Sequence, residues 1–293
     1  MGYGSYSASD WSKLKQSKGL SKDQNVEEVF KAKSCNPKMD PKYINKRECF
    51  DSAEHPNTTP IVVGLDVTGS MGYLAVEIAT GALNELITKL YSTGAVEDPA
   101  LMCAAYGDCD DASPLQVSQF ESDIRIAQQL LDLYFEDGGS GQVVPTLLWE
   151  FLLEHTEIDA IKKRNQKGFV FTIGDCATIR KDKINETVSR VIGDQCVKTR
   201  EELLAELEQK FNVFHIVVDS SNGDNAFMSG RIMRISPTEI SAIPEIIIST
   251  IQMQKGMGID EAVNQWSDVT RPIVRAAVAQ LCLITDNSVE INL

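Results

Sequence analysis

Residues 60–70, which read PIVVGLDVTGS, decide the fold of this 293-residue chain. Their first half, Ile61–Leu65, is a continuous apolar run rich in β-branched residues, which is typical of a strand buried on both faces of a parallel sheet. From Met71 to Tyr91 the apolar side chains recur near helical spacing. The polar residues 66–70 are therefore predicted to form a tight connection between a buried strand and the helix that covers it.

Working outward from this stretch, strands and helices are predicted to alternate. Strands are expected at 100–106, 115–120, 168–173 and 213–218, and helices at 122–133, 145–155, 180–192 and 199–210. This alternation predicts a Rossmann-like α/β fold, in which a doubly wound, mostly parallel central sheet is flanked by helices. One short strand is expected to lie antiparallel at an edge.

The two ends of the chain differ from this central region. Residues 1–57 are rich in Lys, Ser, Asn and Pro, and we expect an N-terminal arm with helices at 10–17 and 21–33. Residues 58–220 form the predicted α/β domain, and residues 221–293 a C-terminal helical extension packing on that domain. Its expected helices lie at 237–252, 258–266 and 272–283.

Composition excludes several classes of function. The net charge is −14, but residues 1–50 hold ten Lys or Arg against six Asp or Glu, so the excess of acid lies in residues 51–293. An acidic body disfavours nucleic acid as a partner. No run approaches the roughly 18 apolar residues of a spanning helix, so we expect no membrane partner. Seven cysteines without a CxxC pair, and no secretory apolar segment, favour a cytoplasmic protein with reduced thiols.

Oxygen-bearing side chains stand where three predicted strands or loops reach one edge of the sheet. Because ligands of open α/β sheets collect at the carboxyl ends of the strands, we expect these side chains to converge. An all-oxygen set suits Mg²⁺, with Mn²⁺ or Ca²⁺ as alternatives, more than Zn²⁺. The predicted metal ligands are Asp66, Thr68, Ser70, Thr146 and Asp175, with Ser140 competing with Thr146 and Asp108 as a further candidate.

The spacing Asp66-x-Thr68-x-Ser70, directly after a strand and before a long helix, resembles the metal-ion-dependent adhesion site (MIDAS) of von Willebrand factor A (vWA) domains. That family combines Asp-x-Ser/Thr-x-Ser with a Thr from a second loop and an Asp after a later strand. Thr146 is the candidate for the Thr of the second loop, although the family's usual Gly-Gly-Thr is absent. Phe171–Asp175 matches the later strand that ends in Asp. The resemblance covers roughly residues 58–220.

The resemblance implies a binding module with no enzymatic activity. In the family, hydroxyls matching Thr68 and Ser70 bind the metal directly, while carboxylates matching Asp66 and Asp175 act largely through water. An Asp or Glu of a protein partner then completes the metal shell. Intracellular members often work beside AAA+ ATPases of the MoxR type, which implies an adaptor role here. A homo-oligomer in which a neighbouring copy fills the site is the other arrangement that the resemblance allows.

Two other interpretations remain open from the sequence. Asp66–Ser70 also resembles the phosphorylation motif of haloacid-dehalogenase-like phosphotransferases, in which Asp66 would be the nucleophile, although a helix is predicted where those enzymes place a β-hairpin flap. A polar sheet edge with no ligand is the simplest alternative, since Asp and Thr are common helix N-caps. The acidic run Asp108–Asp111 is expected to be a solvated loop, with a second cation site as the alternative.

Overall fold

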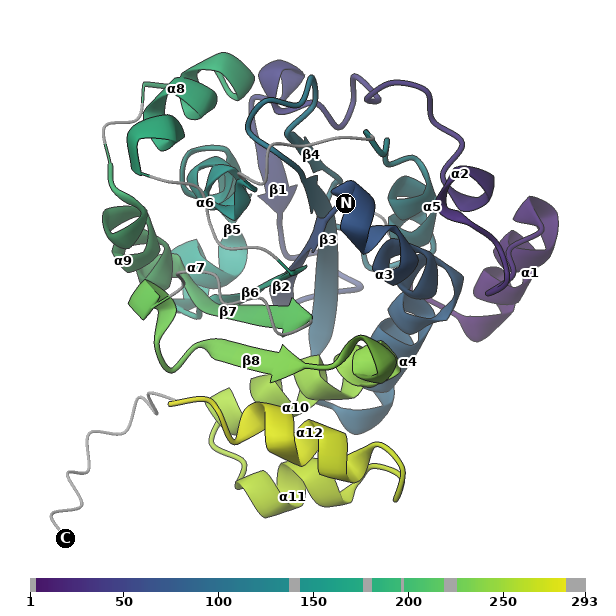
Figure 1. The fold of residues 1–293 in the computed structure, drawn as a ribbon. Helices are drawn as coiled ribbons and strands as arrows, with labels where there is room; N and C mark the ends of the chain where they lie inside the picture. Colours follow the sequence, from purple (N-terminus) through teal and green to yellow (C-terminus); the bar gives the residue numbers. More distant parts are fainter. Residues whose placement is uncertain (1–3, 137–142, 176–180, 196–197, 219–225, 283–293) are drawn as a thin grey trace, which may run out of the picture.

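Six strands form the central sheet of the computed structural model, which describes residues 4–136, 143–175, 181–195, 198–218 and 226–282 (Figure 1). In spatial order they are β4 (Leu115–Val117), β3 (Asp98–Tyr106), β2 (Thr58–Asp66), β6 (Gly168–Gly174), β7 (Phe211–Val218) and β8 (Ile232–Ile235). Every neighbouring pair is parallel except β3 and β4. The predicted doubly wound α/β fold and its short antiparallel edge strand are confirmed.

Helices cover both faces of this sheet, on opposite sides of it in Figure 1. One face packs against α3 (Gly72–Glu77), α4 (Leu83–Thr93), α5 (Arg125–Leu131) and α10 (Ile243–Gln254). The other packs against α6 (Pro145–Glu154), α8 (Lys181–Val191) and α9 (Arg200–Lys210). Along β2 the side chains alternate between these layers: Ile61 and Val63 join the first core, whereas Val62 joins the second. Burial on both faces explains why the strand is apolar at successive positions.

The helical region after β2 is interrupted, whereas the spacing predicted one helix. A π-helical segment, η3 (Ile78–Ala82), separates α3 from α4, and the backbone N–H of Leu83 donates to the carbonyl of Ile78, five residues earlier. The wider turn keeps apolar residues of α3 and α4 on one buried face. A short 3₁₀ turn, η2 (Gly69–Met71), precedes α3 and leads directly out of the Asp66–Ser70 motif.

The C-terminal region continues the first core. After a 3₁₀ segment, η5 (Pro237–Ala242), helix α10 packs against α4, followed by α11 (Ile259–Asn264) and α12 (Arg271–Val278). The prediction of a helix from 237 is wrong for its first turns, because Ser236 caps a 3₁₀ segment there. Sequence patterns also gave no sign of the two-stranded sheet of β1 (Arg47–Cys49) and β5 (Thr156–Ile158) or of α7 (Asp159–Arg164), which are too short for a clear period.

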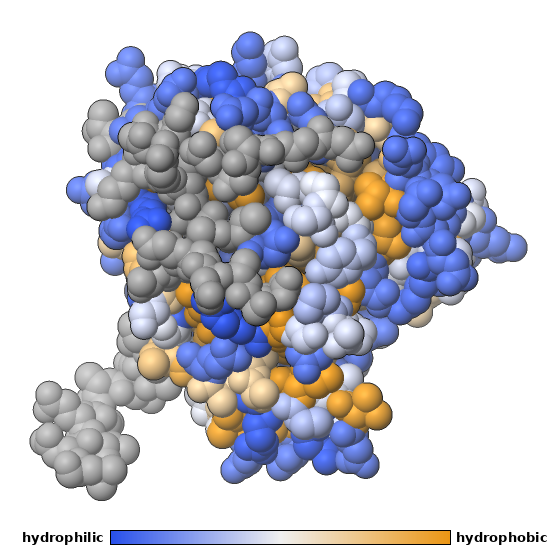
Figure 2. Space-filling view, viewed as in Figure 1, coloured by the Kyte–Doolittle hydropathy of each residue, from blue (hydrophilic) through white to orange (hydrophobic). Residues whose placement is uncertain are grey.

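The N-terminal arm lies against the first core. Helix α1 (Ala8–Lys18) buries Trp11 and Leu14 there, and in Figure 2 the outer surface around it is hydrophilic. The helix expected at 21–33 is wrong in extent: only α2 (Val26–Val29) forms, because Asn25 caps its start and Phe30 turns to an extended conformation. A 3₁₀ turn, η1 (Pro41–Tyr43), leads into β1, and η4 (Ala226–Met228) follows β7.

Within the described ranges, no helix has the combination of length and apolar character that crossing a bilayer requires.

Candidate metal centre

Asp66 is the last residue of β2, and its carboxylate is buried with only one oxygen satisfied. The side chain is 1% exposed. Its Oδ1 accepts hydrogen bonds from the backbone N of Thr68 at 2.9 Å and from Thr68 Oγ1 at 2.6 Å. Its Oδ2 is buried and has no hydrogen-bond partner among the residues that the structure describes. Because leaving a buried carboxylate oxygen unpaired is costly, this atom marks a place where a cation or a proton is needed.

The end of β6 lies against this carboxylate. A Cβ on Gly174 would stand 2.9 Å from both Cβ and Oδ2 of Asp66 and 3.0 Å from the hydroxyl of Tyr106, so no larger residue fits without displacement. The Tyr106 hydroxyl donates to the carbonyl of Ile173 at 2.9 Å, which joins the ends of β3 and β6. Asp175 follows directly and is half-buried. The structure thus brings Asp66 and Thr68 into contact, with Asp175 near enough for its charge to act on Asp66.

The remaining predicted ligands lie on neighbouring segments. Ser70 is in η2, two residues beyond Thr68, and is exposed. Thr146 is in the first turn of α6; it is fully buried, and within the described ranges its hydroxyl has no hydrogen-bond partner. The backbone N of Val144 donates to the carbonyl of Gly107 at 3.1 Å, which holds the start of α6 to the loop after β3. Ser140 lies outside the described residues.

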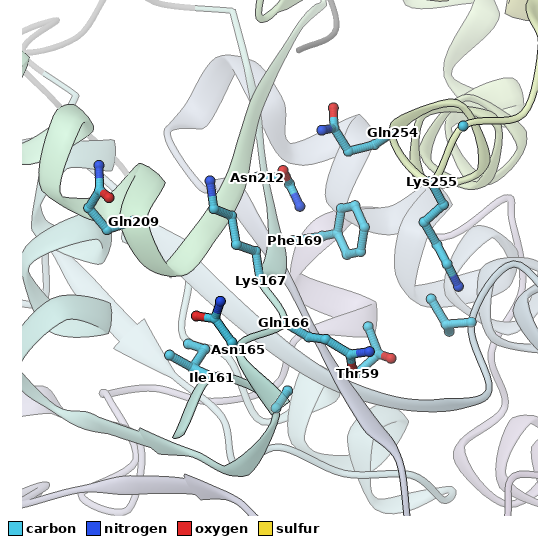
Figure 3. A pocket seen from close by; sticks show the side chains of 13 residues that line it. Thr59, Ile161, Asn165, Gln166, Lys167, Phe169, Gln209, Asn212, Gln254 and Lys255 are labelled. Atoms are coloured by element: carbon cyan, nitrogen blue, oxygen red, sulfur yellow. The ribbon is translucent and has the colours of Figure 1, made fainter. Parts of the chain in front are cut away.

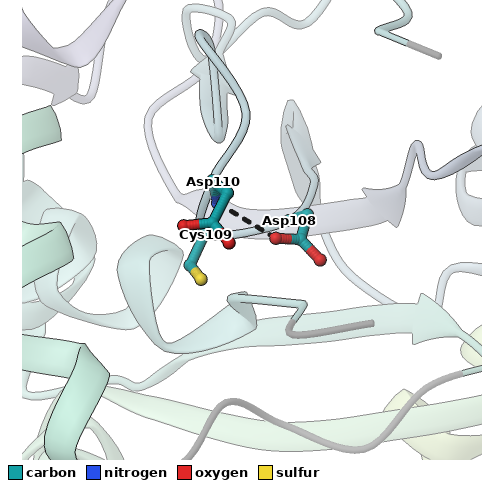
Figure 4. Close-up of side chains that lie close together, drawn as sticks. All are labelled: Asp108, Cys109 and Asp110. Atoms are coloured by element: carbon teal, nitrogen blue, oxygen red, sulfur yellow. Dashed lines mark hydrogen bonds between the residues drawn. The ribbon is translucent and has the colours of Figure 1, made fainter. Parts of the chain in front are cut away.

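The acidic run after β3 is not a solvated loop, which corrects the expectation from the sequence. Asp108, Cys109 and Asp111 are buried, and only Asp110 is exposed. Asp108 Oδ1 accepts a hydrogen bond from the backbone N of Asp110 at 3.0 Å (Figure 4). This bond stabilises the conformation of the loop. Arg190 of α8 donates to the backbone carbonyls of Cys109 and Asp111 from outside.

Figure 4 also shows the side chains of Asp108, Cys109 and Asp110 close together, with ligand atoms within 4.8 Å of one another. Burial and the two flanking carboxylates raise the pKa of the Cys109 thiol to about 11. The thiol stays protonated at neutral pH, and a protonated thiol is a poor metal ligand. In the absence of a metal, the loop therefore places carboxylates and a neutral thiol beside the neighbouring centre.

Asp111 is the residue that reasoning from the sequence missed. Its Oδ2 accepts from the backbone N of Asp108 at 2.8 Å, and its charge acts on Asp66. Burial raises the pKa of Asp111 to about 6, and the carboxylates of Glu136, Asp108 and Asp110 add to the rise. The sequence offered one signal, an Asp three residues after Asp108, but only the folded loop shows which acid turns inward.

Electrostatics of the centre follow from these contacts. Burial raises the pKa of Asp66 to about 7; the hydrogen bonds from Thr68 oppose this rise, and the charges of Asp175 and Asp111 increase it. Three carboxylates therefore interact at one edge of the sheet. A divalent cation would offset their repulsion and give the unpaired oxygen of Asp66 a partner.

The donor set fits a hard cation. Asp66, Thr68, Ser70, Thr146 and Asp175 offer carboxylate and hydroxyl oxygens, which Mg²⁺, Mn²⁺ and Ca²⁺ prefer. Two buried oxygens of this set, Asp66 Oδ2 and Thr146 Oγ1, have no partner in the part of the chain that the structure describes. The residues present thus fit the metal that the sequence pattern implies, and they would hold it at the carboxyl ends of β2 and β6.

Comparisons with solved structures found neighbours of low sequence identity. No protein-family model and no curated protein sequence matches the chain. The pilus adhesin SpaC of Lactobacillus rhamnosus GG, in an open conformation, is 10% identical at a TM-score of 0.45, with 71% of this chain and 31% of SpaC covered. Manganese-loaded TRAP of Plasmodium vivax is 15% identical at a TM-score of 0.38, with 64% of this chain and 72% of TRAP covered. The assignment of function therefore rests on the geometry of the site.

Gly174→Ala should impair the metal centre without unfolding the protein. The new methyl group would stand 2.9 Å from Asp66 Oδ2 and push the carboxylate aside. We expect the rise in melting temperature on adding Mg²⁺ to shrink or vanish. Gly69→Ala is the matched control, because a Cβ at that position would have nothing within 4 Å of it. Equal Mg²⁺ responses in the two variants would contradict the proposed position of the metal.

Asp66→Asn should remove a loss of stability that the metal-free protein shows as the pH rises. The folded state keeps the Asp66 proton up to about pH 7, whereas an ordinary Asp releases it near 3.8, so rising pH destabilises the fold across that window. Asn retains the acceptor for Thr68 but carries no charge. In EDTA we expect the variant to exceed the wild type at pH 8 by on the order of 4 kcal/mol in unfolding free energy.

The same denaturant titrations at pH 4 serve as the control, because Asp66 is then close to neutral in the folded state. There the stability difference should be far smaller. A difference that stays constant from pH 4 to pH 8 would show that Asp66 is ionised in the folded protein throughout.

Proposed function

We propose that this chain is a metal-dependent protein-binding module of the vWA type. Asp66, Thr68, Ser70, Thr146 and Asp175 would hold Mg²⁺, or Mn²⁺ or Ca²⁺ in its place, and an Asp or Glu of a protein partner would complete the metal shell. The observation that carries this proposal is the buried, unpartnered Oδ2 of Asp66 beside the end of β6. In a site that only binds, no bond need be broken.

Two side chains next to the proposed metal support access by a partner at this edge. Ser70 is exposed, and Tyr73, the second residue of α3, is 43% exposed. Aromatic side chains beside a binding site commonly supply contact area in protein interfaces. The surface next to the proposed metal thus offers both a polar and an apolar contact.

The negative charge of this protein would make binding of an acidic partner dependent on the metal. Residues 51–293 carry 18 Lys or Arg and 36 Asp or Glu, so the body repels an acidic partner at long range. A bound divalent cation would offset most of the negative charge of Asp66, Asp175 and Asp111. Metal and acidic ligand would then bind as one linked unit, with weak binding in the absence of metal.

Family resemblance extends this proposal to a biological role. We propose a cytoplasmic adaptor that works beside an AAA+ ATPase of the MoxR type, with a homo-oligomer as the alternative assembly. The support is the Asp66–Ser70 pattern together with the order of the three predicted loops. Fold and motif alone do not identify a partner, so the chemistry of the site has to be tested first.

The residues that follow the Asp66–Ser70 motif argue against the phosphotransferase alternative. Residues 69–93 run through η2, α3, η3 and α4, all of them helical, where a β-hairpin flap would be required. One oxygen of Asp66 is also engaged by two hydrogen bonds from Thr68. A phosphorylation assay nevertheless separates the two functions, because only a nucleophilic Asp66 would form a hydroxylamine-sensitive acyl phosphate.

Mg²⁺ or Mn²⁺ should raise the melting temperature of the wild type, and Asp66→Ala and Thr68→Ala should abolish that rise. Stabilisation follows mass action, so it should grow with the logarithm of metal concentration above the dissociation constant. Asp268→Ala is the control, since that side chain is 93% exposed and pairs with Arg271 in the C-terminal region. Undiminished stabilisation in both site variants would overturn the metal assignment.

Partner capture should require the metal. Immobilised wild type and Asp268→Ala should retain the same protein from a lysate in Mg²⁺ and lose it in EDTA, whereas Asp66→Ala should not retain it in either buffer. Incubation with acetyl phosphate should leave no hydroxylamine-sensitive label on the wild type. A label that disappears in Asp66→Asn would establish the phosphotransferase function and refute the binding module.

A further inference from the structure

The N-terminal arm contacts the helical region that follows the Asp66–Ser70 motif. Helix α1 contacts α4, and α2 contacts α3 (Figure 1). The Tyr6 hydroxyl donates to Asn84 Oδ1 at 3.0 Å, and Lys22 pairs with Glu77 at 2.6 Å. The arm therefore touches, at several points, the segment that follows the proposed metal ligands.

The tightest of these contacts joins Val26 of α2 to Gly72, the first residue of α3. A Cβ on Gly72 would stand 2.4 Å from Cγ2 of Val26, so no larger residue fits there while α2 keeps its place. Gly72 has φ −57° and ψ −36°, a right-handed helical conformation that residues with a side chain adopt readily. A glycine there costs conformational entropy that the backbone geometry does not require. The close approach of Val26 accounts for it.

Gly72 directly follows the turn that carries one of the proposed metal ligands. This turn, η2, ends at Met71, whose backbone N donates to the carbonyl of Thr68 at 2.9 Å. Met71 is fully buried and anchors the turn in the core. Val26 packs on the next residue. The turn that carries Ser70 is thus held by a core contact at one residue and by an arm contact at the following one.

The arm contact can open without unfolding the sheet. Residues 21–25, which connect α1 to α2, are polar, and none of them is buried. The Lys22 side chain is 57% exposed in its pair with Glu77, and exposed ion pairs stabilise a structure little. Val26 is only partly buried. A segment with so few buried contacts can detach locally while the rest of the fold persists.

The large hollow of this protein lies at the other end of the sheet from the metal centre. It has a volume of about 930 Å³, and Thr59 and Phe169 are among its lining residues (Figure 3). These are the second residues of β2 and β6, whereas Asp66 and Gly174 end the same two strands. A ligand in this hollow would be remote from the proposed metal. The arm, by contrast, reaches the residue next to η2.

We propose that docking of the N-terminal arm regulates the metal centre, with Val26 as the positioning residue. Val26 packed on Gly72 keeps η2, and with it Ser70, in the arrangement that binds the metal. When the arm detaches, the turn loses this contact and the metal binds more weakly. The coupling is reciprocal, so a bound metal also holds the arm more firmly. This inference rests on the proposed metal-binding function.

Compensating substitutions test the coupling. Gly72→Ala sets a methyl group against Val26 and should displace α2, which we expect to lower the Mg²⁺ affinity measured by isothermal titration calorimetry about tenfold. Adding Val26→Ala removes the clashing methyl group and should restore the affinity to within about threefold of the wild type. Among the described residues, only Val26 has atoms within 4 Å of the added Cβ. Val29→Ala, the same change at a buried position of α2, is the matched control and should not restore the affinity.

Hydrogen exchange in EDTA gives a readout that needs no metal. The amides of Val29 and Phe30 donate to the carbonyls of Asn25 and Val26, so their exchange reports on α2. They should exchange about tenfold faster in Gly72→Ala than in the wild type, and adding Val26→Ala should slow them again. In the wild type, Mg²⁺ should slow the same amides further, as reciprocal coupling requires.

The outcomes separate this inference from the proposed function. Equal Mg²⁺ affinities of the wild type and Gly72→Ala would overturn the coupling alone. So would a loss of affinity in Gly72→Ala that Val26→Ala does not relieve, because the methyl group would then act on the turn directly. A wild type that does not bind Mg²⁺ would overturn the proposed function and the coupling with it.

Discussion

Burial of the Asp66 carboxylate against Gly174 is the constraint on which the carboxyl edge of the sheet depends. Thr68 satisfies one oxygen with two hydrogen bonds, and the other oxygen is left inside the protein without a partner. β6 can end beside it only because residue 174 has no side chain. The hydroxyl of Tyr106, which donates to the carbonyl of Ile173, holds the ends of β3 and β6 together beside the same carboxylate. The geometry thus keeps a negative charge where water does not reach it, which is unfavourable unless a proton or a cation is bound.

The surrounding acids make a cation the better solution near neutral pH. A proton neutralises Asp66 alone, whereas a divalent ion also offsets Asp175 and Asp111, whose charges act on the same carboxylate. The backbone of the acidic loop is held in place by Arg190 and by internal bonds of Asp108 and Asp111, so the repulsion cannot be relieved simply by swinging the loop outward. Repulsion among these carboxylates favours metal binding, because a cation relieves it. The same negative charge repels an acidic partner until the metal is bound.

The sequence predicts those features of the structure that local patterns determine, and it fails where contacts between distant segments determine them. The apolar run Ile61–Leu65 and the residue spacing of the later helices reflect burial on a sheet, so the layers and the strand alternation could be predicted. The same reasoning placed Asp66, Thr68 and Asp175 at one edge. It failed where a contact with a distant segment decides the outcome: Asp111 is buried by the loop after β3, and the helix at 21–33 is cut to Val26–Val29 by Phe30, which enters the core beside Phe135. The short strands β1 and β5 exist only through their mutual pairing.

The two ends of the sheet differ in chemistry because helices in this fold run opposite to the strands they follow. Helix α6 therefore begins at the carboxyl edge, with Thr146 in its first turn, whereas α9 and α10 end at the amino edge. Strand β6 connects the two ends from Gly168 to Gly174, a span of roughly 20 Å, which is about twice the screening length of physiological salt. Charged side chains at the amino edge are consequently screened from a cation at Asp66.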